Sequence, residues 1–132
     1  MKSITLRTRK HCELIDISRQ VEHVIQQCGL SDGAAMVFVG HTTAGITINE
    51  NADPSVAADI LASLERLIPK EGEYRHVEGN SDAHAKASLM GCSLMVPVRK
   101  GKLVLGTWQG IYFCEFDGPR SRQFQVVPLA AF

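Results

Sequence analysis

Ser93-Leu-Met-Val-Pro-Val-Arg-Lys-Gly-Lys-Leu-Val-Leu-Gly106 is the stretch of this sequence that decides the fold class. Its two apolar runs, Ser93 to Val98 and Leu103 to Gly106, are typical of β-strands. Between them stand Arg99-Lys100-Gly101-Lys102, turn residues with a glycine where a hairpin often requires a positive φ. We therefore expect an antiparallel hairpin in this stretch.

The sequence that follows this hairpin predicts more β-structure. Ile111 to Phe116 indicates a strand, Asp117-Gly118-Pro119 a turn, and Gln123 to Val127 the last strand. The chain after residue 92 is thus expected to contain strands and turns and no helix.

Strands are also expected in the first half of the chain. Ser3 to Arg9 alternates polar and apolar residues, and Cys12 to Ile17 is predicted to be its hairpin partner. Ala34 to Val39 is a continuous apolar run, which predicts a buried central strand. Gly45 to Asn49 alternates again, with Ile46 and Ile48 expected to face inward.

Three helices are predicted, at Ser18 to Cys28, Pro54 to Ile68 and Asp82 to Met90. Gly29 and Gly91 are typical C-terminal stops, and Asp53 before Pro54 is a strong helix start. The predicted class is therefore α+β, a single domain over residues 1–132 with a largely antiparallel sheet or sandwich. A (β/α)₈ barrel is excluded because that fold needs roughly 200 residues or more.

Composition narrows the classes of partner and compartment. The 14 basic and 14 acidic residues cancel, whereas a nucleic-acid-binding protein normally carries a basic excess. A nucleic-acid partner is therefore not expected. No apolar stretch is long enough to span a bilayer and no signal peptide is expected, so a membrane partner is not expected either. The four cysteines, at positions 12, 28, 92 and 114, form no paired motif. They are interpreted as free apolar packing residues of a protein in the reducing cytoplasm.

Three histidines are candidates for a shared site. His76 and His84 lie in the stretch from Tyr74 to Gly91, which begins as a polar loop and ends as a helix. His41 closes the apolar run that begins at Ala34. Their spacing matches no standard ligand motif, so scattered surface histidines are the alternative to a metal or acid–base site.

If these three histidines converge, they leave one position on a metal ion open for water or substrate. Imidazoles suit zinc and related ions, whereas magnesium prefers carboxylates and water. Glu50 is a candidate for the carboxylate that handles a proton, and Lys86 and Arg120 are candidates to stabilise phosphate charge. For each of these three residues, a solvated surface position is the simpler alternative.

The segment Gly106-Thr107-Trp108-Gln109-Gly110 interrupts the β-pattern with two glycines around the only tryptophan. One interpretation is a β-bulge or corner with Trp108 in the core. The other is a loop that approaches a ligand, in which Trp108 stacks on a flat ring and Gln109 also contacts the ligand. The sequence leaves both interpretations open.

Seven motifs together resemble the YjbQ-like family, often labelled secondary thiamine-phosphate synthase. The resemblance runs roughly from Ile4 to Val127. In chain order the motifs are His41-Thr42-Thr43-Ala44, Ile48-Asn49-Glu50-Asn51 with Asp53-Pro54, Tyr74-x-His76, Gly79-Asn80, Ala83-His84-x-Lys86-Ala87-Ser88, Leu103-Val-Leu-Gly-Thr-Trp108-Gln109-Gly-Ile111 and Glu115-Phe116-Asp117-Gly118-Pro119-Arg120.

This resemblance implies an α+β homotrimer with the histidines in clefts between subunits. It also implies the joining of a pyrimidine pyrophosphate to a thiazole phosphate with release of pyrophosphate, as a secondary activity. The expected function is thus a metal-assisted enzyme for a small phosphorylated metabolite, with a zinc ion at His41, His76 and His84. Magnesium is the alternative ion because the substrate is a pyrophosphate. The alternative function is a non-catalytic trimer that binds a metal ion and a ligand.

Overall fold

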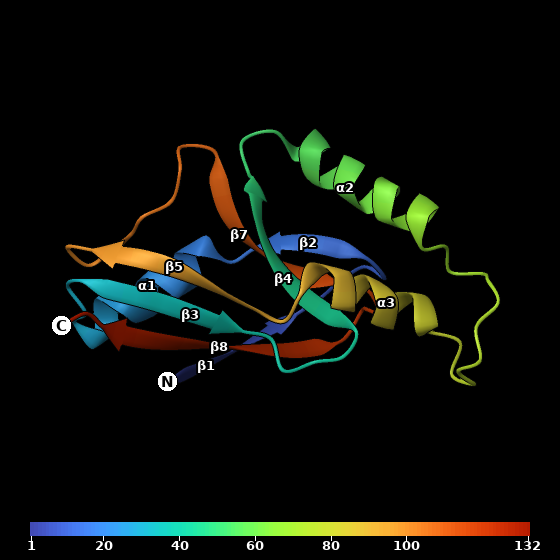
Figure 1. Cartoon of the computed structure of the whole chain (residues 1–132), viewed down its shortest axis with the longest axis horizontal. Helices are drawn as coiled ribbons and strands as arrows, with labels where there is room; N and C mark the ends of the chain where they lie inside the picture. Colours follow the sequence, from blue (N-terminus) through green and yellow to red (C-terminus); the bar gives the residue numbers. More distant parts are fainter.

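Two curled antiparallel sheets and three helices make up the structure, a computed structural model that describes residues 1–132 (Figure 1). The larger sheet has the strand order β1-β8-β3-β5-β6, and the smaller has the order β2-β7-β4. The elements are β1 (Lys2–Arg7), β2 (Glu13–Asp16), α1 (Ser18–Cys28), β3 (Gly33–Phe38), β4 (Ala44–Glu50), α2 (Pro54–Leu67), α3 (Ser81–Met90), β5 (Ser93–Arg99), β6 (Lys102–Leu103), β7 (Gln109–Glu115) and β8 (Ser121–Ala130).

The main core joins the inner faces of both sheets and the apolar side of α1. Every second residue along a strand points to the same face, so Ala35 and Val37 of β3 pack with Phe124 and Val126 of β8. Phe113 of β7 belongs to the same cluster. Removing this apolar surface from water supplies the main driving force for joining the two sheets.

The helices form where local signals require them. Gly29 adopts a left-handed conformation and ends α1. Asp53 accepts a hydrogen bond from the backbone N–H of Ser55, 2.9 Å away, and Pro54 follows at the first helical position of α2. Gly91 has a positive φ and follows α3. The three predicted helices and the α+β class are confirmed: α1 has the predicted ends, and α2 and α3 each differ by one residue at one end.

Two strand predictions need correction. Cys12 to Ile17 is not the hairpin partner of the first strand, because β2 pairs with β7 while β1 pairs with β8. Six residues of β1 pair with β8, so a distant partner offers the first strand a longer ladder than the nearby segment does. β3 is central in its sheet, but it is not buried on both faces, since Phe38 is 40% exposed on the outer face.

The structure also excludes one of the two interpretations of the segment around Trp108, the one that places Trp108 in the core. Trp108 is 62% exposed, so it does not fill the core. The predicted strand from Leu103 to Gly106 shortens to the two residues of β6, and β7 begins at Gln109. A side chain at Gly110 would overlap Asn51, whose amide nitrogen would lie 2.6 Å from an added Cβ. Close backbone approach therefore explains this glycine.

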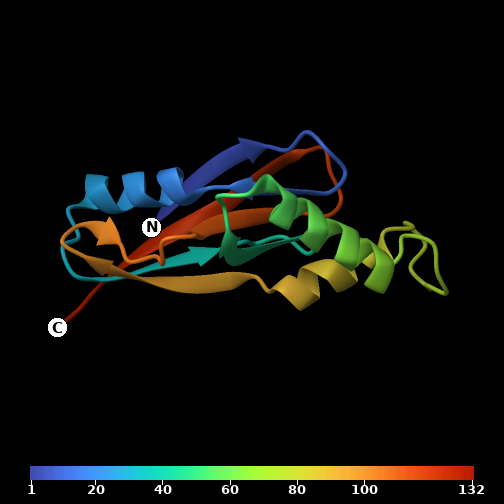
Figure 2. The ribbon, with the colours of Figure 1, turned by 90° about the horizontal axis from the view of Figure 1, so that it is seen from above.

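None of the three helices combines the length and the apolarity that crossing a bilayer requires. α2 lies at the outside of the molecule, apart from the larger sheet in Figure 1 and beside α3 in Figure 2. Leu64 is the only buried residue of α2.

Candidate functional site

α3 carries His84 and packs against β4 at a point where both backbones come close. A Cβ added at Gly45 would lie 2.8 Å from the carbonyl oxygen of Gly91 and 3.2 Å from Cβ of Met90. Ala83 and Ala87 on the inner face of α3 are buried. Small residues therefore bring the end of the helix against the strand, and His84 stays half-buried beside this contact.

His41 is held by the backbone of β8. The ladder between β3 and β8 runs only as far as the pair Phe38 and Gln125, so Gln123 lies beyond it. The ring of His41 takes the place of the missing strand residue: its Nε2 lies 3.1 Å from the carbonyl oxygen of Gln123 and 3.0 Å from its amide nitrogen. With its proton on Nε2, the neutral ring donates to this carbonyl and Nδ1 keeps a free lone pair. With its proton on Nδ1, Nε2 accepts from the backbone N–H of Gln123.

Burial lowers the pKa of His41 below its ordinary value, and the nearby positive charge of Arg122 lowers it further. The imidazole is therefore neutral at neutral pH. The tautomer that donates Nε2–H to the carbonyl of Gln123 has the usual arrangement of a metal-binding histidine.

His41 and His84 line the same pocket, which has a volume of about 460 Å³. The ring of His76, in the loop before α3, meets the ring of His84 edge-on, with centroids 5.3 Å apart. The other lining residues of the pocket are Thr42, Ala44, Ala87, Ser88, Gly91 and Cys92. Each predicted histidine thus has another predicted histidine as a neighbour.

This arrangement does not amount to a metal centre within one chain. No group of three or more His, Cys, Asp or Glu side chains is arranged to hold a metal ion. The predicted role of the three histidines as a shared ligand set therefore stays a prediction.

Three other predicted site residues lie at the opposite end of the smaller sheet. Glu50 pairs with Gln109 at one end of the β4–β7 ladder, and the backbone N–H of Asn51 donates to the carbonyl of Trp108. The pocket is at the other end, near Ala44. Seven strand residues span roughly 20 Å, so Glu50, Trp108 and Gln109 do not reach the histidines of their own chain.

Lys86 lies in a different environment from His84, although only two positions separate them on α3. Its Nζ donates to Oε2 of Glu65 at 2.6 Å and to Oδ2 of Asp82 at 3.1 Å. The side chain is only 2% exposed. Burial alone would lower the pKa of Lys86, but the hydrogen bonds that the amine donates to these two carboxylates outweigh it, and the net pKa is raised. Lys86 therefore ties α3 to α2, away from the pocket.

Arg120 is half-exposed and uses its side chain within the turn that precedes β8. Its Nε donates to the carbonyl of Asp117 at 2.9 Å, and its Nη2 donates to Oδ2 of Asp117 at 3.0 Å. Its charge is close enough to contribute to the lowered pKa of His41. Arg120 thus borders the histidine site without lining the pocket.

Cys92 is a residue of the pocket that sequence reasoning missed. All four cysteines are predicted to be packing residues, yet only Cys114 is buried, and Cys28 and Cys92 are exposed. Cys92 lines the pocket with His41 and His84. The available signal was its position directly after Gly91, which ends the helix that carries His84.

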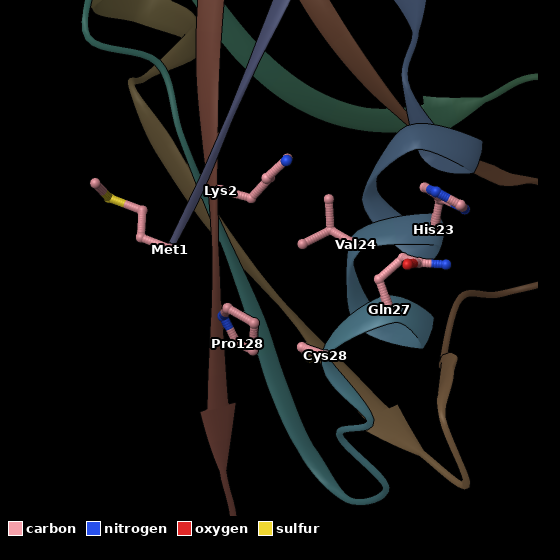
Figure 3. Close-up of a pocket in the computed structure, with 7 residues that line it drawn as sticks. All are labelled: Met1, Lys2, His23, Val24, Gln27, Cys28 and Pro128. Carbon is pink, nitrogen blue, oxygen red and sulfur yellow. The ribbon is translucent and has the colours of Figure 1, made fainter.

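A second pocket, of about 330 Å³, lies between α1 and the strands β1 and β8 (Figure 3). His23 is exposed and lines it together with Val24, Cys28 and Pro128. No predicted site residue lines this pocket.

The fold and this pocket define a small α+β protein of two antiparallel sheets, with imidazoles collected where a helix end meets a strand. The chain belongs to the family described as UPF0047 protein YjbQ-like, whose model matches residues 2–130. This match assigns no activity to the chain.

Relatives and solved structures agree with this assignment. The chain is 55% identical over 121 residues to UPF0047 protein MJ1081 of Methanocaldococcus jannaschii, covering 92% of this chain and 88% of the relative. It is 54% identical over 123 residues to UPF0047 protein YugU of Bacillus subtilis, covering 92% and 93%.

Two crystal structures are similar over nearly the whole chain. An uncharacterised conserved protein of the YjbQ/UPF0047 family from Clostridium acetobutylicum superposes with a TM-score of 0.96 at 55% identity, covering 98% of this chain and all of the other. A YbjQ-like protein of unknown function from Sulfolobus solfataricus superposes with a TM-score of 0.94 at 36% identity, covering 98% and 96%.

Proposed function

We propose that the pocket lined by His41 and His84 binds a divalent transition metal ion, zinc by preference, with His76 as a third ligand. The observation that carries the proposal is that two imidazoles line one pocket and that the lowered pKa of His41 keeps its ring neutral. Imidazole suits zinc better than magnesium, which prefers oxygen ligands. A bound ion would supply a Lewis acid that polarises a phosphate oxygen.

The proposed substrate is a small phosphorylated metabolite. The charges of Arg122 and Arg120 lower the pKa of His41 and outweigh the opposing charge of Glu115, so the field at His41 is positive. Such a field attracts phosphorylated anions. Magnesium carried in by a pyrophosphate substrate remains compatible with this proposal.

The specific reaction to test is thiamine-phosphate synthesis. In that reaction the ring nitrogen of a thiazole phosphate forms a bond to the carbon that carries the pyrophosphate of the pyrimidine. The bond from this carbon to oxygen breaks, and pyrophosphate leaves with the electron pair, so no oxidant or reductant is needed. The role of the chain would be to orient the two substrates and to stabilise the departing negative charge.

A homotrimer is part of the proposal, because one chain does not bring the predicted residues together. Glu50, Trp108 and Gln109 lie at the far end of the smaller sheet from the histidines. The outer face of the larger sheet exposes apolar side chains that a second copy of this chain would cover, among them Phe38, Met95 and Leu129. In this assembly a neighbouring copy supplies the end that carries Trp108. Light scattering that gives a monomer mass at micromolar concentration would contradict it.

A second candidate function is a non-catalytic trimer that binds a metal ion and a ligand. One observation favours it: the side chains that line the pocket include no carboxylate, lysine or arginine. A catalytic site normally adds such a group to its metal ligands.

For either function, we infer a cytoplasmic location, because all four cysteines are free thiols.

The metal proposal is tested on untagged protein stripped of metal and titrated with zinc by calorimetry. If the zinc affinity is shared among its ligands, each imidazole contributes ~3 kcal/mol, so His84→Ala and His41→Ala should each weaken zinc binding about 100-fold. His23→Ala is the matched control, since His23 is exposed and lies outside this pocket. Equal losses in His23→Ala and His84→Ala would contradict the ligand assignment.

The catalytic proposal is tested by a coupling assay on the same protein. We expect slow formation of thiamine phosphate, well below the usual enzyme median of about 10 per second. Wild type, His84→Ala and Glu50→Gln are compared at matched metal content. Unchanged activity in His84→Ala would contradict the proposal that this pocket catalyses the reaction. Zinc binding without turnover favours the binding trimer.

A further inference from the structure

We propose that the connection from Glu115 to Gln123, where β7 leads into β8, is the positioning element of the histidine pocket. Arg122, Glu115 and Gln123 hold the turn that carries His41, and Asp117 holds the start of the helix that carries His84. The chemical purpose of this positioning rests on the proposed function, but the positioning itself can be measured without it.

Glu115 and Arg122 form an ion pair inside the molecule. Glu115 is 0% exposed and Arg122 is 3% exposed. Nε of Arg122 donates to Oε1 of Glu115 at 2.9 Å, and Nη2 of Arg122 bonds to Oε2. The carboxylate also accepts from the hydroxyl of Thr8 at 2.7 Å and from the backbone N–H of Asp117 at 3.0 Å. A pair with its hydrogen bonds satisfied is a rigid anchor.

This anchor reaches the turn of His41 through Thr43. Nη2 of Arg122 donates to the hydroxyl of Thr43 at 2.9 Å and to its carbonyl at 3.3 Å. The next residue of β8, Gln123, holds the ring of His41. Gln123 and Arg122, two consecutive residues of β8, therefore hold the two ends of the segment from His41 to Thr43. This limits the positions that the imidazole can take.

The same connection also holds α3. Oδ2 of Asp117 accepts a hydrogen bond from Nδ2 of Asn80 at 2.9 Å, and it is also paired with Arg120. Asn80 is the N-cap residue of α3, but its side chain makes no capping hydrogen bond, and its Oδ1 is buried without a partner. The backbone N–H of His84 donates to the carbonyl of Asn80 at 3.3 Å.

The side chain of Asn80 thus ties the helix to the connection instead of capping it. The positions of His41 and His84 are consequently both set relative to one nine-residue connection. The histidines come from distant segments, and this common frame explains how a pocket can form between them. Arg122, Thr43 and Asp117 are assigned as positioning residues, since none of them lines the pocket.

The test uses Thr43→Val, which removes the hydroxyl that accepts from Arg122 and preserves the shape of the side chain. Thr8→Val is the control for the direct link: it removes a buried threonine hydroxyl that bonds to the same Glu115 and to the backbone of Arg120, but it leaves both bonds from Arg122 to Thr43 in place. Asp117→Ala removes the carboxylate that bonds to Asn80 and so tests the contact that holds the start of α3. Imidazole ¹H–¹³C and ¹⁵N spectra are recorded on the metal-free protein, and the thermal midpoint of each variant is measured.

We expect Thr43→Val to shift the ring signals of His41 and the amide signal of Gln123 while leaving His84 in place. Asp117→Ala should shift the ring signals of His84. Thr8→Val should lower the thermal midpoint and shift neither ring. Thr43→Ser, which keeps the hydroxyl, should restore the His41 signals. If Thr43→Val does not fold, Thr43→Ala removes the same hydroxyl.

Zinc affinity gives a second readout. Groups that orient ligands typically contribute 10- to 100-fold to metal affinity, so Thr43→Val and Asp117→Ala should weaken zinc binding by about that factor. Unchanged ring signals in Thr43→Val, or equal shifts in Thr8→Val, overturn the positioning role. If the wild type binds no zinc, the proposed metal site fails, and the ring signals still decide the positioning.

Discussion

Removing the buried amine of Lys86 should destabilise the protein severely, and Lys86→Met is the substitution that tests it. Methionine keeps the length and the apolar stem of the side chain. The substitution leaves Asp82, which is 1% exposed, without its cationic partner. It also removes the bond to Glu65, whose side chain is 54% exposed.

The two carboxylates should contribute very differently. Removing one partner of a buried ion pair costs about 3–5 kcal/mol, because the remaining charge is buried and unpaired. An exposed ion pair contributes at most about 1 kcal/mol, so water can replace the amine at Glu65. We therefore expect Lys86→Met to lose about 3–5 kcal/mol, nearly all of it through Asp82.

At this chain length 1 kcal/mol corresponds to about 4 °C, so the thermal midpoint should fall by about 12–20 °C. The assay is urea and thermal denaturation at pH 7, followed by circular dichroism. The double variant Asp82→Ala with Lys86→Met should recover most of the loss, since replacing a whole buried pair by apolar groups is often nearly neutral. Glu65→Gln is the control and should change the free energy of unfolding by less than about 1 kcal/mol.

Several results would refute this reasoning. A loss below about 1 kcal/mol in Lys86→Met would mean that Asp82 is not left with an unpaired charge. A double variant less stable than Lys86→Met would mean that the two side chains do not act as a pair. If Lys86→Met keeps full stability but loses the coupling activity, the lysine acts on the substrate, as the sequence first predicted.

Two further predictions follow from the structure. Burial alone would raise the pKa of Glu115, but hydrogen bonds from Arg122, Thr8 and Asp117 outweigh it and leave the net pKa lowered. A lowered carboxyl pKa stabilises the fold above the unfolded value of about 4.3 and loses this contribution as the pH falls through the folded value. The difference in thermal midpoint between wild type and Glu115→Gln should therefore shrink as the pH falls from 7 to 3, and a constant difference would contradict it. Zinc should slow iodoacetamide alkylation of Cys92 but not of Cys28, which is also exposed, as mass spectrometry would show. An alkylation rate of Cys92 that zinc leaves unchanged would place the ion elsewhere.

The histidine site could be predicted only in part from the sequence. Histidines at the ends of elements indicated His41 and His84 as candidates, and the structure places both in one pocket. The same reasoning put Lys86 beside them, but in the structure its amine binds Glu65 and Asp82 outside the pocket. Two residues that are close in a motif need not share a helix face. It missed Cys92, since exposure depends on which elements cover a residue and not on the residue itself.

The sequence by itself determined the helices and the α+β class. Gly29, Gly91 and the pair Asp53-Pro54 act through bonds to residues a few positions away, so their effect can be predicted locally. Only the tertiary structure decided which strands pair and which histidines meet. β1 pairs with β8, as in Leu6 with Arg122, because burying both sheets in one core selects partners across the whole chain. His41 likewise meets His84 through Gln123 and Asp117, contacts between distant segments that local patterns do not encode.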